Sequence, residues 1–76
     1  MDAVLALRAL AAIIGDEVLR ERFLALTGCD APTLRANAGR PEMAVAVRDF
    51  LCGHEPDLLR VAAMLDVPPA ALCGHR

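Results

Sequence analysis

Residues 39–56, with the sequence GRPEMAVAVRDFLCGHEP, place a glycine and a proline ahead of an apolar run and a second such pair behind it. Proline fits the first turn of a helix, where its missing N–H has no partner to lose, and glycine is favoured just past a helix end. The stretch predicts a helix that opens at Pro41 and stops at Gly53, with another starting at Pro56. In the helix that opens at Pro41, the residues expected to face the core are Met43, Val47, Phe50 and Leu51.

Similar pairs of helix-ending and helix-starting residues recur along the rest of the chain. Gly15-Asp16 and Gly28-Cys29-Asp30 each place a glycine after an apolar run and an aspartate, a favoured N-cap residue, ahead of the next run. We expect Gly15 to end the first helix in a left-handed conformation. Further helices are therefore predicted at about 2–14, 16–27 and 30–38, and residues 69–73 can add a last turn after Val67-Pro68-Pro69.

Apolar residues recur at helical spacing in each segment, and no period-2 run of any length predicts a strand. The fifteen alanines also favour closely packed helices. We expect one all-α domain over residues 1–76, a compact bundle of five short helices with the C-terminal turn as a sixth. The remaining residues expected in the core are a stripe of Val4, Leu7, Ala11 and Ile14, flanked by Leu5, Leu10 and Ile13; then Leu19, Phe23 and Leu26; Leu34 and Ala38; and Leu58, Val61, Ala62 and Leu65.

The charge pattern argues against phosphate binding. Net charge is −2, and the eight basic residues, all arginines, are spread along the chain among acids rather than clustered. Three cysteines form no obvious disulfide framework, so we expect a reduced, cytoplasmic setting. The apolar residues 3–14 are too few to span a bilayer and lack a basic leader, so no membrane association is expected.

The first helix is apolar on nearly all sides, and such a helix needs cover from several directions. One interpretation is a face for self-association or for docking a partner. The other is that Ala3, Ala6, Ala9 and Ala12 are exposed at little cost.

A repeated motif, LCGH at residues 51–54 and 72–75, is the strongest candidate for a metal site. Cys52 with His54 and Cys73 with His75 could supply four zinc ligands, with Cys29 as a spare. A one-residue spacing between ligands is unusual, however, and Cys52 falls at the apolar end of a helix. We therefore expect no metal, with buried cysteines and solvated histidines.

Groups for nucleophilic catalysis are scarce. Thr27 and Thr33 are the only hydroxyl-bearing residues, and the chain has no Ser, Tyr or Lys. A Cys–His pair would need a cleft, an orienting group and an oxyanion donor, for which so small a bundle has little room. We expect a non-enzyme with no catalytic, cofactor-binding or metal-binding residues and no cofactor.

The stretch from Leu59 to Leu72 has the residue pattern of a helix-turn-helix, with small residues in its first helix and a tight turn at Val67. The second segment, PPAALCGHR at residues 68–76, is short and has almost no side chain that reads bases or binds phosphate before Arg76. Nucleic acid is therefore not the expected partner.

The residues also form a recognisable string. Its members are Arg22-Phe23-Leu24-Ala25-Leu26-Thr27-Gly28, Asp30, Leu34-Arg35, Ala46-Val47, Asp49-Phe50-Leu51, Gly53, Glu55, Leu58-Leu59 and Val67-Pro68-Pro69. This string resembles a family of small uncharacterised alphaproteobacterial proteins, a domain family of unknown function, and the resemblance covers about residues 5–72. The resemblance implies an all-helical cytoplasmic domain with no assigned activity.

The resemblance is not complete. The family tends to have leucine or a similar residue in place of Cys29 and Cys52, and an acidic residue in place of Arg40 and His54. It also usually continues as a helix beyond Val67-Pro68-Pro69. Apolar residues at the cysteine positions argue against a metal site shared by the family.

Three polar members of the string, Arg22, Arg35 and Asp49, are not explained by capping. We expect an Arg–Asp ion pair that holds the second or third helix to the fourth. The alternative is that Arg22 and Arg35 flank an acidic group of a partner.

The function expected from the sequence is a small non-catalytic protein-interaction module. It would self-associate or dock onto a larger bacterial protein, so its partner is an unidentified protein or a second copy. The alternative is a nucleic-acid-linked regulator that uses the C-terminal helix pair.

Overall fold

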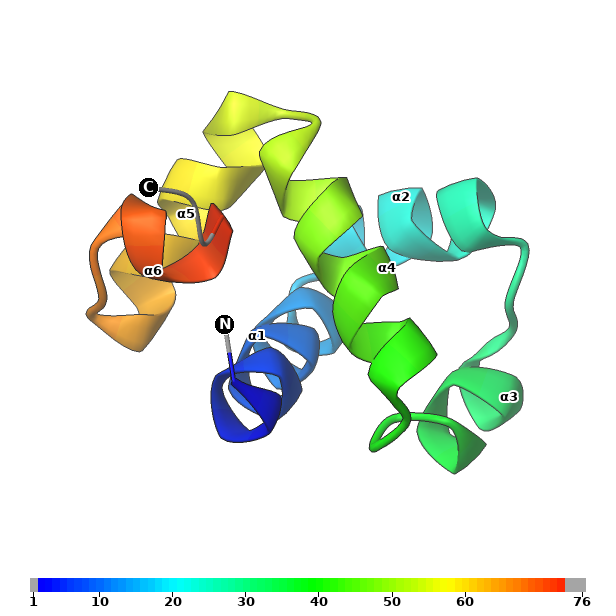
Figure 1. Cartoon of the computed structure of the whole chain (residues 1–76). Helices are drawn as coiled ribbons and strands as arrows, with labels where there is room; N and C mark the ends of the chain where they lie inside the picture. The colour runs from blue at the N-terminus through cyan, green and yellow to red at the C-terminus, as the bar shows by residue number, and fades with distance from the viewer. Residues whose placement is uncertain (1, 74–76) are drawn as a thin grey trace.

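A computed structural model describes residues 2–73, and within them every regular element is a helix (Figure 1). The expected all-α bundle is confirmed, including the last turn near the C-terminus. The elements are α1 (Ala3–Gly15), α2 (Glu17–Thr27), α3 (Ala31–Ala36), α4 (Pro41–Cys52), α5 (Glu55–Leu65) and α6 (Pro69–Cys73).

Aspartates cap the first three helices, and the two caps predicted from the sequence, Asp16 and Asp30, are among them. Asp2, Asp16 and Asp30 each accept a hydrogen bond from the backbone N–H three residues on, at 2.8, 3.1 and 2.9 Å. These bonds satisfy amides that have no partner inside the helix. At Asp30 the Thr33 hydroxyl and backbone N–H hold the pKa of the carboxyl below its ordinary value, because both stabilise the charged form.

The helix ends agree with the expectation at Gly28 and differ at Gly15. Gly28 follows α2 in the left-handed region, with φ of 73°. Gly15 is instead the last residue of α1 and does not have positive φ. No left-handed residue is needed there, because the extended Asp16 ends α1 and caps α2 at once, with almost no connecting loop.

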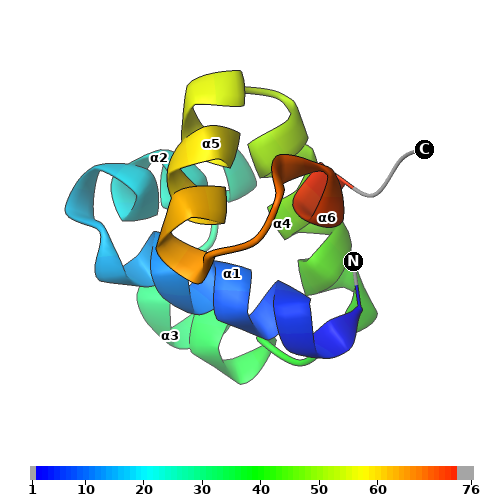
Figure 2. The same ribbon diagram turned by 90° about the vertical axis from the view of Figure 1, so that its left-hand side faces the viewer.

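Two helices, α1 and α4, lie at the centre of the bundle (Figures 1 and 2). Both contact α2, α5 and α6, and they also contact each other. Phe23 of α2 and Phe50 of α4 meet edge to face, with ring centroids 5.2 Å apart. Among the described helices α3 stands most apart, below α1 in Figure 2, and reaches the core through Leu34.

The core residues expected in α4 are confirmed, but those expected in α1 are partly wrong. In the stripe of Val4, Leu7, Ala11 and Ile14 the first three are exposed, with Val4 68% and Leu7 44% exposed, and Ile14 packs against the core only in part. The buried residues of α1 are Ala6, Ala9, Leu10 and Ile13. The small alanine side chains on that face let the neighbouring helices approach closely. Ala6 and Ala9 are therefore buried, although one interpretation of the sequence had expected them to be exposed.

Leu26 is a second correction, since it is 69% exposed although Leu19 and Phe23 on the same helix are buried. Leu26 lies at the edge of a hollow that it shares with Ala46, Asp49 and Phe50 of α4, so the side of α4 covers it only in part. Within residues 2–73 no helix is both long and apolar enough to cross a membrane.

Candidate functional site

Most arginine side chains in the described part hold helices together. Arg8 of α1 donates from Nη2 to the Leu65 carbonyl at the end of α5, at 3.2 Å. Arg60 of α5 contacts the carboxylate of Asp16, between α1 and α2, at 2.9 Å. Arg20 donates to the carbonyl of Ile14 at 3.4 Å. Side chains engaged in this way are not free to form a phosphate-binding surface.

The ion pair of Arg22 is present but has a different partner from the one expected. Its Nη1 lies 2.6 Å from Oδ2 of Asp57 in α5, while Asp49 in α4 has only a loose contact with Arg48 at 3.8 Å. Sequence reasoning missed Asp57, because an aspartate in the first turn of a helix is explained by the helix dipole alone.

Asp57 is a buried carboxylate, 5% exposed. No donor reaches its Oδ2 at an angle suited to a hydrogen bond. Arg22 therefore approaches it as an ion pair without a well-directed N–H donor. The Arg22 guanidinium also lies over the Phe50 ring, 5.7 Å from its centroid. This cluster joins α2, α4 and α5 and has a structural role.

Two arginines, Arg35 and Arg40, make no ion pair and no side-chain hydrogen bond with any residue in the range 2–73. Both are exposed, and they lie on α3 and just before α4. The free positive charge of the described part therefore gathers around α3.

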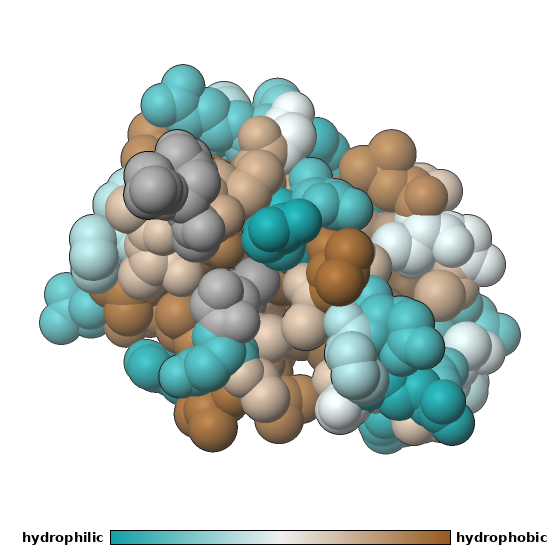
Figure 3. All heavy atoms as spheres, in the orientation of Figure 1, coloured by the Kyte–Doolittle hydropathy of each residue, from teal (hydrophilic) through white to brown (hydrophobic). Residues whose placement is uncertain are grey.

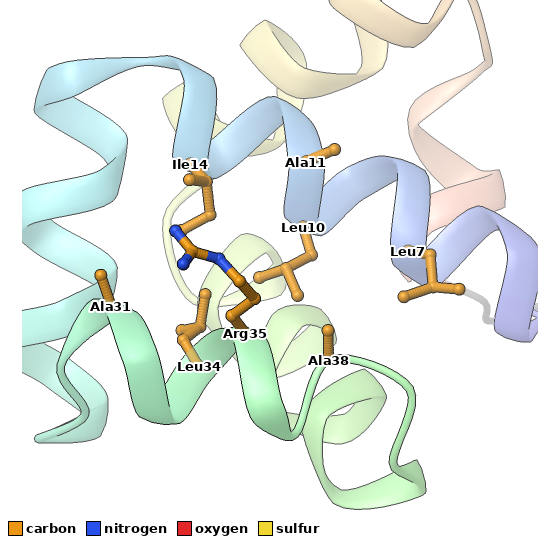
Figure 4. Close-up of a pocket in the computed structure, with 8 residues that line it drawn as sticks. All are labelled: Leu7, Leu10, Ala11, Ile14, Ala31, Leu34, Arg35 and Ala38. Carbon is orange, nitrogen blue, oxygen red and sulfur yellow. The ribbon is translucent and has the colours of Figure 1, made fainter.

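A groove runs between α1 and α3, next to one of these arginines (Figure 4). Its volume is about 370 Å³. Leu10 and Leu34 point into it from opposite walls, and Arg35 reaches from α3 toward Ile14. The residues that line this α1–α3 groove are Leu7, Leu10, Ala11, Ile14, Ala31, Leu34, Arg35 and Ala38.

The groove lies on the α1 surface that the sequence predicted to be buried. Leu7, Ala11 and Ile14 belong to the expected core stripe and instead form one wall. Ala11 also lines a second, shallower hollow on the α5 side of α1. In Figure 3 apolar surface lies over α1 at the lower edge, beside hydrophilic surface over the turn between α3 and α4.

The two LCGH motifs come together in the structure, but as a disulfide. Cys52 at the end of α4 and Cys73 in α6 are bonded, with Cα atoms 5.6 Å apart. The expectation of unpaired cysteines is therefore wrong, and Cys52 is exposed rather than buried. The residues of the motif that are buried are the leucines, Leu51 and Leu72. Helix α6 returns to the end of α4, which the spacing of 21 residues alone could not show.

The metal candidates are only partly placed. His54 is exposed, and His75 lies outside the described residues. Within residues 2–73 no three His, Cys, Asp or Glu side chains gather as a metal site. Cys29 is an unpaired, half-buried thiol.

The C-terminal pair resembling a helix-turn-helix consists of α5 and the five-residue α6. Leu72 of α6 is fully buried, so this helix is packed by its apolar side onto the bundle. The described part of α6, PAALC, has no basic residue to contact phosphate.

Comparison with known proteins identifies one family. The family model described as a protein of unknown function (DUF3572) matches residues 2–76. Neither a curated protein nor a solved structure matches the chain.

Proposed function

The chain belongs to the DUF3572 family of proteins of unknown function, and on the basis of its surface we propose that it is a small non-catalytic protein-interaction module. The module docks onto a larger bacterial protein through the α1–α3 groove. The cytoplasmic location is part of the same proposal and rests on the family resemblance alone, because the Cys52–Cys73 disulfide removes the argument from unpaired cysteines.

The observation that carries the proposal is the unpacked apolar wall of α1. Leu7 is 44% exposed and Ala11 is exposed, although each directly follows a buried residue of the same helix, Ala6 and Leu10 respectively. Helix α3 covers this wall only from one side and leaves the groove open. A partner that closes the groove would bury apolar surface at about 25 cal/mol per Å², which is the usual driving force for association.

The chemistry of the described side chains supports a non-catalytic role. The Thr27 hydroxyl donates to the Phe23 carbonyl at 2.8 Å, which is a local helix contact. The one ionisable residue in the groove wall is Arg35, which is permanently charged and cannot exchange a proton at neutral pH. No observation favours the alternative of a nucleic-acid-linked regulator, because most described arginines are engaged within the fold.

A paired capture experiment tests the proposal. Leu7→Gln places a polar group in the groove wall, and Leu26→Gln makes the same change at an exposed leucine outside it. Tagged wild-type protein and both variants are used to capture partners from the host lysate, with quantification by mass spectrometry and a thermal melt of each variant.

We expect one stoichiometric protein to be recovered with wild type and Leu26→Gln, and to be lost with Leu7→Gln. Equal recovery with both variants would place the interaction elsewhere and refute the groove. Recovery of the bait alone, with a monomer mass by light scattering, would refute the interaction module.

A further inference from the structure

Building on the docking function proposed above, we infer that the occupant of the α1–α3 groove is an amphipathic helix of another protein. That helix has a carboxylate beside its apolar stripe, and the carboxylate pairs with Arg35.

The walls of the groove favour a helical occupant. Both walls are helices, whose backbone N–H and C=O groups are already paired along most of their length. An extended peptide would find no strand edge to pair with, and would leave its own backbone groups to water or unpaired.

The spacing of the α1 wall points the same way. Leu7, Ala11 and Ile14 follow one another at i, i+4 and i+7. They cover two turns, a rise of about 10 Å. A helix packed along this stripe would meet it with its own residues at the same spacing, as ridges fit into grooves.

Arg35 selects the charge of the occupant. It is the one charged residue among the eight that line the groove, and it has no ionic partner within residues 2–73. A helix lying over the groove would remove water from the guanidinium. The cost of that desolvation is offset when the incoming side chain is an anion, and a carboxylate can accept two parallel N–H bonds from arginine.

The same charge argues against a second copy of this chain. In a symmetric dimer formed through the groove, the Arg35 side chains of both copies would lie in one interface, and none of the eight lining residues is acidic. Like charges brought together in this way oppose association.

A displayed library of helical peptides tests the inference on the full chain. Each peptide has leucines fixed at i, i+4, i+7 and i+11, and the positions on both flanks of this stripe are randomised among Glu, Gln and Lys. The library is selected separately on wild type, Arg35→Gln, Arg35→Glu and Leu7→Gln. The Arg35 side chain is exposed and unpaired in the described part, so its variants should melt within a few degrees of wild type.

We expect Glu to be enriched over Gln at one flank by about fivefold on wild type, the size expected of a partly exposed ion pair. The preference should vanish on Arg35→Gln and turn to Lys on Arg35→Glu. Leu7→Gln should reduce binding of all peptides.

Three results would overturn the inference. Equal recovery of Glu, Gln and Lys peptides, still lost on Leu7→Gln, would refute the carboxylate and leave the docking function intact. Selection of peptides that bind all four proteins equally, or failure to select any peptide, would refute a helix in the groove. The lysate capture would then decide the docking function by itself. A dimer mass by light scattering that is lost on Leu7→Gln would make a second copy the occupant.

Discussion

Replacing Arg22 by methionine should destabilise the protein, because it leaves the Asp57 carboxylate buried without a cation. Methionine keeps most of the aliphatic stem of arginine, so packing against the Phe50 ring is largely retained. The substitution therefore removes mainly the charge that lies 2.6 Å from Oδ2 of Asp57.

The exposure of the two side chains sets the expected magnitude. Breaking a fully buried pair costs about 3–5 kcal/mol. The Asp57 side chain is 8% exposed but that of Arg22 is 38% exposed, so water can partly solvate the remaining carboxylate and the cost falls to about 2 kcal/mol. For a domain of this size that free energy corresponds to a fall in Tm of about 8–16 °C.

Urea unfolding followed by circular dichroism at the helix band measures this loss. The double variant with Asp57→Asn tests the cause, since a neutral amide costs less to bury than a carboxylate. We expect the double variant to recover about 1 kcal/mol relative to Arg22→Met alone. The control is Arg48→Met, which removes the exposed 3.8 Å contact with Asp49 and should change stability by less than about 0.5 kcal/mol.

The reasoning is refuted if the double variant is no more stable than Arg22→Met. That result would mean that the buried charge is not the source of the loss. An equal loss in Arg48→Met would also refute it, because the two sites would then differ in burial but not in energy.

Three further predictions concern the chain connections. Reducing the Cys52–Cys73 disulfide should lower the free energy of unfolding by about 3 kcal/mol for a loop of this length; alkylation of both thiols without reductant would contradict the pairing. Because the pKa of Asp30 is lowered, its contribution to stability is present above its unfolded pKa of 3.8 and is lost as pH falls further. A carboxyl titration by NMR should therefore place its midpoint below 3.8. Gly28→Ala should cost about 1 kcal/mol, because φ is 73° there and the strain is in the backbone alone, whereas Gly39→Ala should be near neutral.

Capping and helix-breaking residues made the helix positions predictable. The predicted start at Pro41 and stop at Gly53 match α4. Asp16 and Asp30 cap the helices they were expected to cap. These signals act within one turn of the chain, so they depend little on what packs above them.

The buried face of α4 was also predictable, since its apolar and polar residues separate into two faces. The same method was wrong for α1, where apolar residues occur on nearly every side. Periodicity in such a helix indicates no single face, and the stripe through Leu7 and Ile14 was chosen over the one through Ala9 and Ile13.

The candidate site was predictable only in outline. The sequence indicated that α1 has more apolar surface than a small bundle can cover, and it singled out Arg35. It did not indicate that α3 would stand off from α1 beside that surface and leave a groove. The partner of Arg22 was missed for a related reason, because Asp57 is 35 residues away and approaches only when α2 and α5 both pack on α1 and α4.

The sequence by itself determined that the chain is helical, where the helices begin and end to within two residues, and which residues of α4 are buried. These properties follow from interactions over three or four residues. Only the tertiary structure decided which side of α1 is covered, which carboxylate meets Arg22, and that Cys52 meets Cys73. Each of these depends on how helices distant in the chain pack together, and several packings satisfy the same local pattern.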